Sequence, residues 1–246
     1  MESLQWYDWS LALFGAFILG VAKAGVKGID VAIVVIMAFV FGGKASTGII
    51  VPMLIVGDIF AVTYYHRHTQ WEYLARFLPW TALGVLIGVY VGKDLPEALF
   101  TQGMAVIILI NVAVMFWWDR KRSEHVPSHL SFAGGMGLSA GFATMVGNLA
   151  GGFANLFFLA MRIPKDQFIG TAAWLFLIMN LFKTPFHIFV WETITPQTLA
   201  INFYLVPGIL LGLLTGVWLV RRIHDASYRR LILLLTAVGA VLIFFR

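Results

Sequence analysis

Three long stretches of the sequence carry no charged residue, and they restrict the fold more than any other feature. They run over residues 98–118, 130–161 and 198–220. A helix needs about 20 apolar residues to cross roughly 30 Å of hydrocarbon. Of the 246 residues, 60% are hydrophobic and only 12% are charged, a composition that excludes an ordinary soluble domain. The sequence therefore predicts an all-α, polytopic integral membrane protein.

Ten apolar segments follow one another along the chain. Their ranges are 10–25, 29–42, 46–66, 73–92, 98–118, 130–147, 149–161, 168–190, 198–220 and 227–245. The segments 29–42 and 149–161 are too short for a full crossing. Each therefore either crosses partly or forms a re-entrant hairpin with the segment before it. We expect eight to ten transmembrane or re-entrant helices.

Two hydrophobic stretches are each interrupted by glycine-rich polar residues. The stretch 11–41 is interrupted at 23–30, and the stretch 130–161 at 147–152. In a membrane, backbone that leaves the helix must be buried in protein or line a wet cavity, because unpaired peptide groups are costly in lipid. Broken helices at matching places in two halves indicate the binding site of a transporter. We expect the substrate site between these two breaks.

The two halves of the chain resemble each other at spacings of 121 to 128 residues. The matched pairs are Gly20 with Gly141, Gly48 with Gly170, Asp58 with Asn180, and Gly84 with Gly212. Their shared order indicates a duplication. We therefore predict one integral membrane domain made of two repeats, residues 1–125 and 126–246.

Basic residues gather in alternate loops, and this pattern predicts the orientation of the repeats. The basic loops are 66–76, 119–122, 162–165 and 221–230, and the basic-poor or acidic ones are the N-terminus, 93–97 and 191–195. Lysine and arginine concentrate in cytoplasmic loops. Threading ten segments through this pattern places both termini outside, with Lys44 as the one exception. It also makes the repeats antiparallel, the arrangement by which a membrane protein exposes one site alternately to each side.

The first break offers a candidate anion site at Lys23, Gly25, Lys27 and Gly28. A lysine deep in a membrane span marks a pathway or a partner by default. Free amides of the half-helix that begins near Gly28 would also point at an anion. The alternative is that both lysines extend to the cytoplasmic edge and only support the topology.

The second break supplies neutral candidates at Asn148, Gly151 and Gly152, and the span that follows it supplies Lys183. Asn148 either binds a polar ligand or satisfies unwound backbone. Lys183 is a second candidate contact for an anion.

Asp58 is the only acid far inside a long span. A buried carboxylate without a partner favours its neutral form, so an intramembrane aspartate is suited to carry a coupling proton. Sodium is the other candidate coupling ion. A structural hydrogen-bonding role is the alternative.

Several classes of function lack support in the sequence. The chain has no cysteine, which excludes disulfides and thiolate metal sites, and it has no enzyme signature motif. We expect no catalytic residue, metal or cofactor. The net charge of +5 lies in short loops, so we expect no nucleic-acid partner. Glycines repeat every four residues in 84–92 and 208–216, which indicates packing within the chain; a homodimer interface is the alternative.

The order of several short motifs resembles the sulfite exporter TauE/SafE family over about residues 10–245. They are Gly20-x-x-Lys23-x-Gly25-x-x-Gly28, Pro52 to Asp58, Tyr64-x-x-Arg67-x-x-x-Trp71, Leu78-Pro79 with Gly84 and Gly88, Gly147 to Gly152, and Ile169-Gly170-Thr171. The resemblance implies a permease of the bacterial cytoplasmic membrane for sulfite, sulfonates or sulfoacetate. Such a permease would work by rocking one half against the other. An anion channel, a membrane-embedded enzyme and an assembly factor remain alternatives.

Overall fold

In a computed structural model of the chain, residues 4–26, 29–121 and 130–222 are described, and every regular element in them is helical. The helices are α1 (Trp6–Lys23), α2 (Asp30–Phe41), α3 (Gly43–Tyr65), η1 (His66–His68), α4 (Trp71–Gly92), α5 (Glu97–Lys121), α6 (Leu130–Gly147), α7 (Ala150–Ala160), α8 (Lys165–Phe189) and α9 (Pro196–Arg221). The predicted all-α fold is confirmed. The tenth apolar segment, 227–245, lies outside the described residues.

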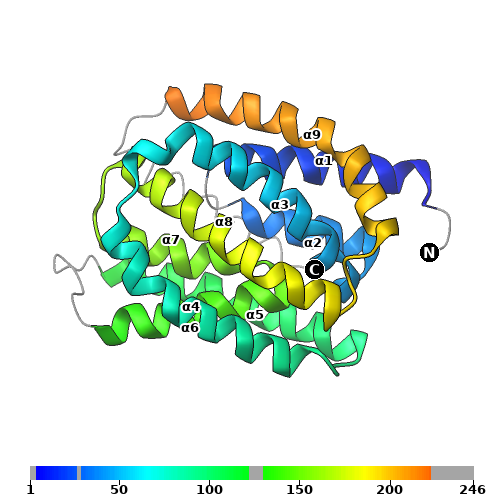
Figure 1. Cartoon of the computed structure of the whole chain (residues 1–246), viewed down its shortest axis with the longest axis horizontal. Helices are drawn as coiled ribbons and strands as arrows, with labels where there is room; N and C mark the ends of the chain where they lie inside the picture. The colour runs from blue at the N-terminus through cyan, green and yellow to red at the C-terminus, as the bar shows by residue number, and fades with distance from the viewer. Residues whose placement is uncertain (1–3, 27–28, 122–129, 223–246) are drawn as a thin grey trace.

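The helices differ in their ability to cross a bilayer. In the described residues, α3 with η1, α4, α8 and α9 are long and apolar enough to do so. The helices α2 and α7 have 12 and 11 residues, so each is only about 17–18 Å long. Gly15 of α1 faces Met37 of α2, because α2 turns back along α1, and α7 turns back along α6 in the same way (Figure 1). The two short segments therefore form hairpins with the helices that precede them.

Two glycine-lined contacts hold neighbouring helices together, α1 on α9 and α4 on α6. A Cβ atom added at Gly20 would overlap the carbonyl oxygen of Ile209, and one added at Gly141 would overlap that of Thr81. Gly212 likewise abuts the backbone of Phe17. Such close backbone approach is how membrane helices gain packing energy without a hydrophobic driving force. In both contacts the residue numbers rise together, so the paired helices run parallel.

The repeats are inverted with respect to each other. Asp58 of α3 meets Asn180 of α8, and Gly170 near the start of α8 abuts the backbone of Tyr65 at the end of α3. These two counterpart helices therefore cross in opposite directions, as Figure 1 also shows for α1 and α6. The predicted boundary between residues 125 and 126 lies outside the described residues.

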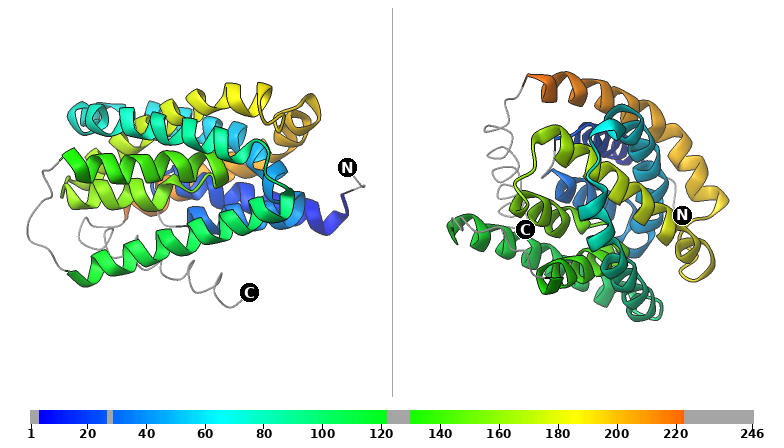
Figure 2. Two further views of the ribbon diagram at one scale, coloured as in Figure 1. Left: turned by 90° about the horizontal axis from the view of Figure 1, so that it is seen from below. Right: turned by 60° about the vertical axis from the view of Figure 1, so that its left-hand side comes forward.

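The packing groups differ from the sequence halves. One group contains α1, α2, α3 and α9, and the other contains α6, α7, α8 and α4. Each group thus takes three helices from one repeat and one from the other, and the contact of α3 with α8, which is more extensive than the contacts of α8 with α4 and α7, joins the two groups. Helix α5 packs against α3, α6 and α7 along the outer edge of the described helices (Figure 2). We call these groups the α1 unit and the α6 unit.

The basic and acidic loops lie at opposite ends of the bundle. At the basic end, Arg221 donates to the hydroxyl of Tyr64, and the amide of Gln70 donates to Thr171. At the acidic end, Glu97 accepts from the amide of Lys44, whose ammonium group donates to the carbonyl oxygen of Lys93. These contacts explain the one exception to the loop pattern: Lys44 begins α3 beside an acidic partner.

Candidate functional site

The first break follows Lys23, the last residue of α1. Gly25 has φ +122°, and the amides of Gly25 and Val26 donate to the carbonyl oxygens of Ala22 and Val21. This is a Schellman motif, which glycine allows because it lacks a Cβ atom. The predicted break is confirmed, and it leaves Lys23 at the end of a helix that stops inside the protein.

The second break follows Gly147, and Asn148 closes it in the left-handed conformation at φ 57°. The Asn148 amide donates to the carbonyl oxygen of Thr144, and the Leu149 amide donates to that of Ala143, so backbone hydrogen bonds close this helix end as well. Unlike glycine, asparagine brings a side chain. Its amide nitrogen donates to the carbonyl oxygen of Thr47 at 3.2 Å, and its oxygen accepts from Lys183. Asn148 therefore stabilises the break and also holds a buried cation.

A buried ion pair lies beside the first break. The Lys23 ammonium is 2.6 Å from Asp58 Oδ1, and Asn180 Nδ2 is 2.6 Å from Asp58 Oδ2. Lys23 is 5% exposed and Asp58 is fully buried. The ammonium also lies 4.8 Å from the centre of the Phe176 ring. An ion pair of this kind resists separation, because removing one partner leaves the other charge uncompensated away from water.

A second buried cation lies beside the second break. Lys183 is fully buried, and its ammonium donates to Thr144 O at 3.1 Å, to Thr144 Oγ1 at 3.0 Å and to Asn148 Oδ1. These three acceptors match the three hydrogens of an ammonium group. Thr144 follows Lys23 by 121 residues, so it occupies the repeat position that Lys23 holds in the first half.

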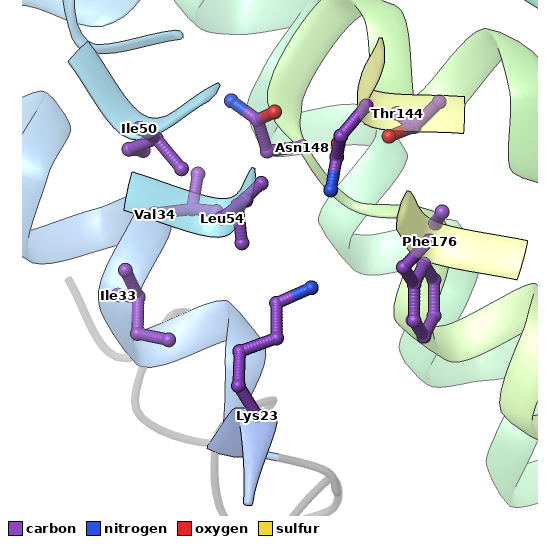
Figure 3. A pocket seen from close by; sticks show the side chains of 11 residues that line it. Lys23, Ile33, Val34, Ile50, Leu54, Thr144, Asn148 and Phe176 are labelled. Atoms are coloured by element: carbon purple, nitrogen blue, oxygen red, sulfur yellow. The ribbon is translucent and has the colours of Figure 1, made fainter. Parts of the chain in front are cut away.

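A small cavity separates the two cations. It is about 30 Å³ in volume, on the scale of one water molecule. Lys23, Asn180, Thr144 and Asn148 supply its polar wall (Figure 3). Its other lining residues are Ile33, Val34, Ile50, Leu54, Ala150, Gly151 and Phe176. Ala150 and Gly151 begin α7, and the first amides of a helix have no acceptor within it. The cavity thus adjoins one ammonium group and the start of a helix, and both features favour an anion.

The predicted site residues fall into three groups. Lys23, Asn148 and Gly151 line the cavity, while Asp58 and Lys183 hold or contact residues that do. Gly25 and Gly152 instead have packing roles: a Cβ atom at Gly25 would crowd Ile169 and Val220, and one at Gly152 would overlap Asn111. Lys27 and Gly28 lie outside the described residues.

A larger recess opens at the acidic end. It is about 990 Å³ in volume, and its charged lining residues are Asp8, Lys44, Glu97 and Glu192. Ile49 of α3 lines this recess, whereas the next residue, Ile50, lines the central cavity. The two spaces therefore reach neighbouring residues of the same helix. We call the recess the vestibule.

Sequence reasoning missed Thr144 and Phe176. Thr144 was detectable, because the 121-residue spacing that pairs Gly20 with Gly141 also pairs Lys23 with Thr144. Phe176 carries no such signal, since aromatic residues are abundant throughout the chain. In the described residues, no three histidine, aspartate or glutamate side chains come together as metal ligands.

Comparison with protein-family models gives a match to the family described as sulfite exporter TauE/SafE, over residues 11–243. Neither the curated proteins nor the solved structures gave a match.

Proposed function

The chain belongs to the sulfite exporter TauE/SafE family of membrane transporters, and from that premise we propose that it is a secondary transporter of small sulfur-containing anions. Sulfite, sulfonates and sulfoacetate are the candidate substrates. The protein would move them across the bacterial cytoplasmic membrane by alternating access.

One observation carries this proposal: a buried lysine, Lys23, lines a cavity at the two helix breaks, and a buried aspartate and a second buried lysine contact its lining residues. Lysine is rare inside membranes because burying its charge is costly, and where it occurs it usually serves a pathway or a substrate. Lys23 is the residue that reaches the cavity itself. The anion would bind its ammonium group and the first amides of α7, with Lys183 as the supporting charge behind Asn148.

Alternating access is supported by two separate spaces, the cavity at the helix breaks and the vestibule at the acidic end. The moving bodies would be the α1 unit and the α6 unit rather than the sequence halves, because the glycine contacts lock α9 to α1 and α4 to α6. Rotation about the α3–α8 interface would open the cavity to the vestibule or to the basic end. Inverted repeats support this change of access. Each unit can adopt the conformation of the other, and the opening of the cavity then moves to the opposite side of the membrane.

The distribution of loop charge supports one orientation of the protein. Arginine and lysine in short loops favour the cytoplasmic side, so the basic end would face the cytoplasm. The vestibule and the N-terminus would then face outward. Accessibility of a single cysteine introduced at Trp6 or at Arg67 to an impermeant thiol reagent in intact cells tests this orientation; labelling at Arg67 alone contradicts it.

Transport itself is tested in proteoliposomes with a panel of radiolabelled sulfite, thiosulfate, methanesulfonate, sulfoacetate and acetate. We expect uptake of at least one sulfur-containing anion, with faster uptake when unlabelled substrate is inside. Lys23→Met should abolish uptake, whereas Lys93→Met, an exposed lysine at the acidic end, should leave it intact. Conductance without such exchange indicates a channel, chemical conversion of the anion indicates an enzyme, and no flux of any anion contradicts the proposal.

A further inference from the structure

The charges around the central cavity do not balance. In the described helices the buried charged side chains are Lys23, Lys183 and Asp58, which are two cations and one anion. His187 is buried seven residues beyond Asn180, with Nδ1 on the Thr193 hydroxyl. The hydroxyl of Tyr65 donates to the carbonyl oxygen of Ala24. These three described charged groups together carry one excess positive charge, which a monovalent anion neutralises.

A divalent anion would reverse this balance. The two ammonium groups would then face the carboxylate of Asp58 and two further negative charges, so one negative charge would remain without a partner in a buried site. Buried charges of this kind are neutralised rather than tolerated. The available means is a proton, and among the three charged groups only Asp58 becomes neutral by gaining one.

The contacts of Asp58 are suited to both of its protonation states. Lys23 bonds one carboxylate oxygen and also lines the cavity, so an anion that binds Lys23 competes directly with Asp58. Asn180 holds the other oxygen. An amide group contains a donor and an acceptor, so after rotation Asn180 can accept a hydrogen bond from the protonated carboxyl group. An aspartate at position 180 in place of asparagine would offer no hydrogen-bond donor to the ionised carboxylate of Asp58.

We propose that a divalent anion enters this site, which must widen beyond its water-sized cavity to admit it, only together with one proton, and that Asp58 takes that proton. The inference rests on the proposed function, since it assigns the coupling ion of the same site. The step forms one O–H bond on a carboxylate oxygen of Asp58, with water as the proton source. A monovalent anion would bind and move without a proton.

The first experiment counts protons on binding. Purified protein in weakly buffered detergent is mixed with thiosulfate or with methanesulfonate, and a pH dye reports proton uptake while a filter assay reports bound anion. We expect about one proton per bound thiosulfate and none per methanesulfonate. Equal uptake for both anions, or none for thiosulfate, overturns the inference. Failure to bind either anion while no anion is transported contradicts the proposed function instead.

Two variants locate the proton. Asp58→Asn should bind thiosulfate without proton uptake, whereas Glu72→Gln, the same chemical change at an exposed residue, should behave like the unchanged protein. Proton uptake that persists in Asp58→Asn overturns the assignment. If Asp58→Asn does not fold, Lys183→Met provides the test: with one cation fewer, methanesulfonate should bind with about one proton, and binding without proton uptake contradicts the charge balance.

Discussion

Each of the two helix breaks is closed by a residue with positive φ, but the side chains around the two breaks differ in chemistry. Gly25 closes the first break and Asn148 the second, each in a backbone conformation with positive φ. The first break places a lysine on Asp58, whereas the second uses neutral side chains to hold a lysine that comes from α8. The path of the backbone and the glycine contacts are therefore alike at the two breaks, whereas the charged groups differ.

The largest effect in this comparison should come from Lys23→Met. The substitution leaves Asp58 buried without its cation, which costs about 3–5 kcal/mol of folding stability. A thermal melt in detergent measures this loss, and anion uptake should vanish with it. The double variant Lys23→Met/Asp58→Asn should recover most of the stability but none of the uptake. If the double variant is no more stable than the single one, the ion pair is not the source of the loss.

The next largest effect should come from Asn148→Gly. This substitution closes the second break with glycine, the residue type that closes the first. Glycine adopts positive φ without cost, so the break should persist. The hydrogen bond from Lys183 is lost, however, and bonds to charged groups contribute about 1.5–3 kcal/mol. Anion affinity should therefore fall about 10- to 100-fold. Isothermal titration measures it; unchanged affinity would mean that Lys183 does not support the site.

A smaller effect is expected where the halves are alike. Gly141→Ala places a Cβ atom on the carbonyl oxygen of Thr81, and overpacking of this kind costs about 1–3 kcal/mol. Gly20→Ala, at the counterpart position, should cost a similar amount. Gly135→Ala, in the same helix as Gly141 but with open space around it, serves as the control and should not destabilise the protein. A large difference in melting temperature between Gly141→Ala and Gly20→Ala would show that the two glycine-lined contacts are not equivalent.

The smallest effect should come from Thr144→Val. It removes one of the three acceptors around the Lys183 ammonium and leaves the carbonyl oxygen of Thr144 in place. One hydrogen bond contributes about 1 kcal/mol, so anion affinity should fall about fivefold. Thr215→Val is the matched control, because its hydroxyl is exposed and bonds its own helix. Equal changes in the two variants would exclude Thr144 from the site.

The sequence was sufficient to predict the helices and the breaks, because lipid imposes strict rules on backbone. Long uncharged runs predicted the described helices, and glycine-rich interruptions predicted where α1 and α6 end. The matched spacing of Gly20 and Gly141 indicated that glycine occupies equivalent positions in the two halves. These features depend on local composition, so a single chain contains them.

The contacts of the site were less predictable, because they depend on how distant helices meet. Nothing in the sequence states that Lys23 reaches Asp58, or that Gly152 faces Asn111 instead of the cavity. The exchange of α4 and α9 between units was also hidden, since repeats read along a chain suggest two self-contained halves. Counterpart spacing would have indicated Thr144, but only after Lys23 had been assigned to the site.

The parallel contact between α1 and α9 has a consequence for biogenesis. A ribosome completes α1 roughly 170 residues before it begins α9, so Gly20 must wait in the translocon or the lipid without its partner. The contact between α4 and α6 closes much earlier, because their sequences are separated by one helix. Insertion should therefore proceed through an intermediate in which the α6 unit is assembled and the first helix is still undocked. Chaperones or insertases that shield small-residue surfaces would act on that intermediate.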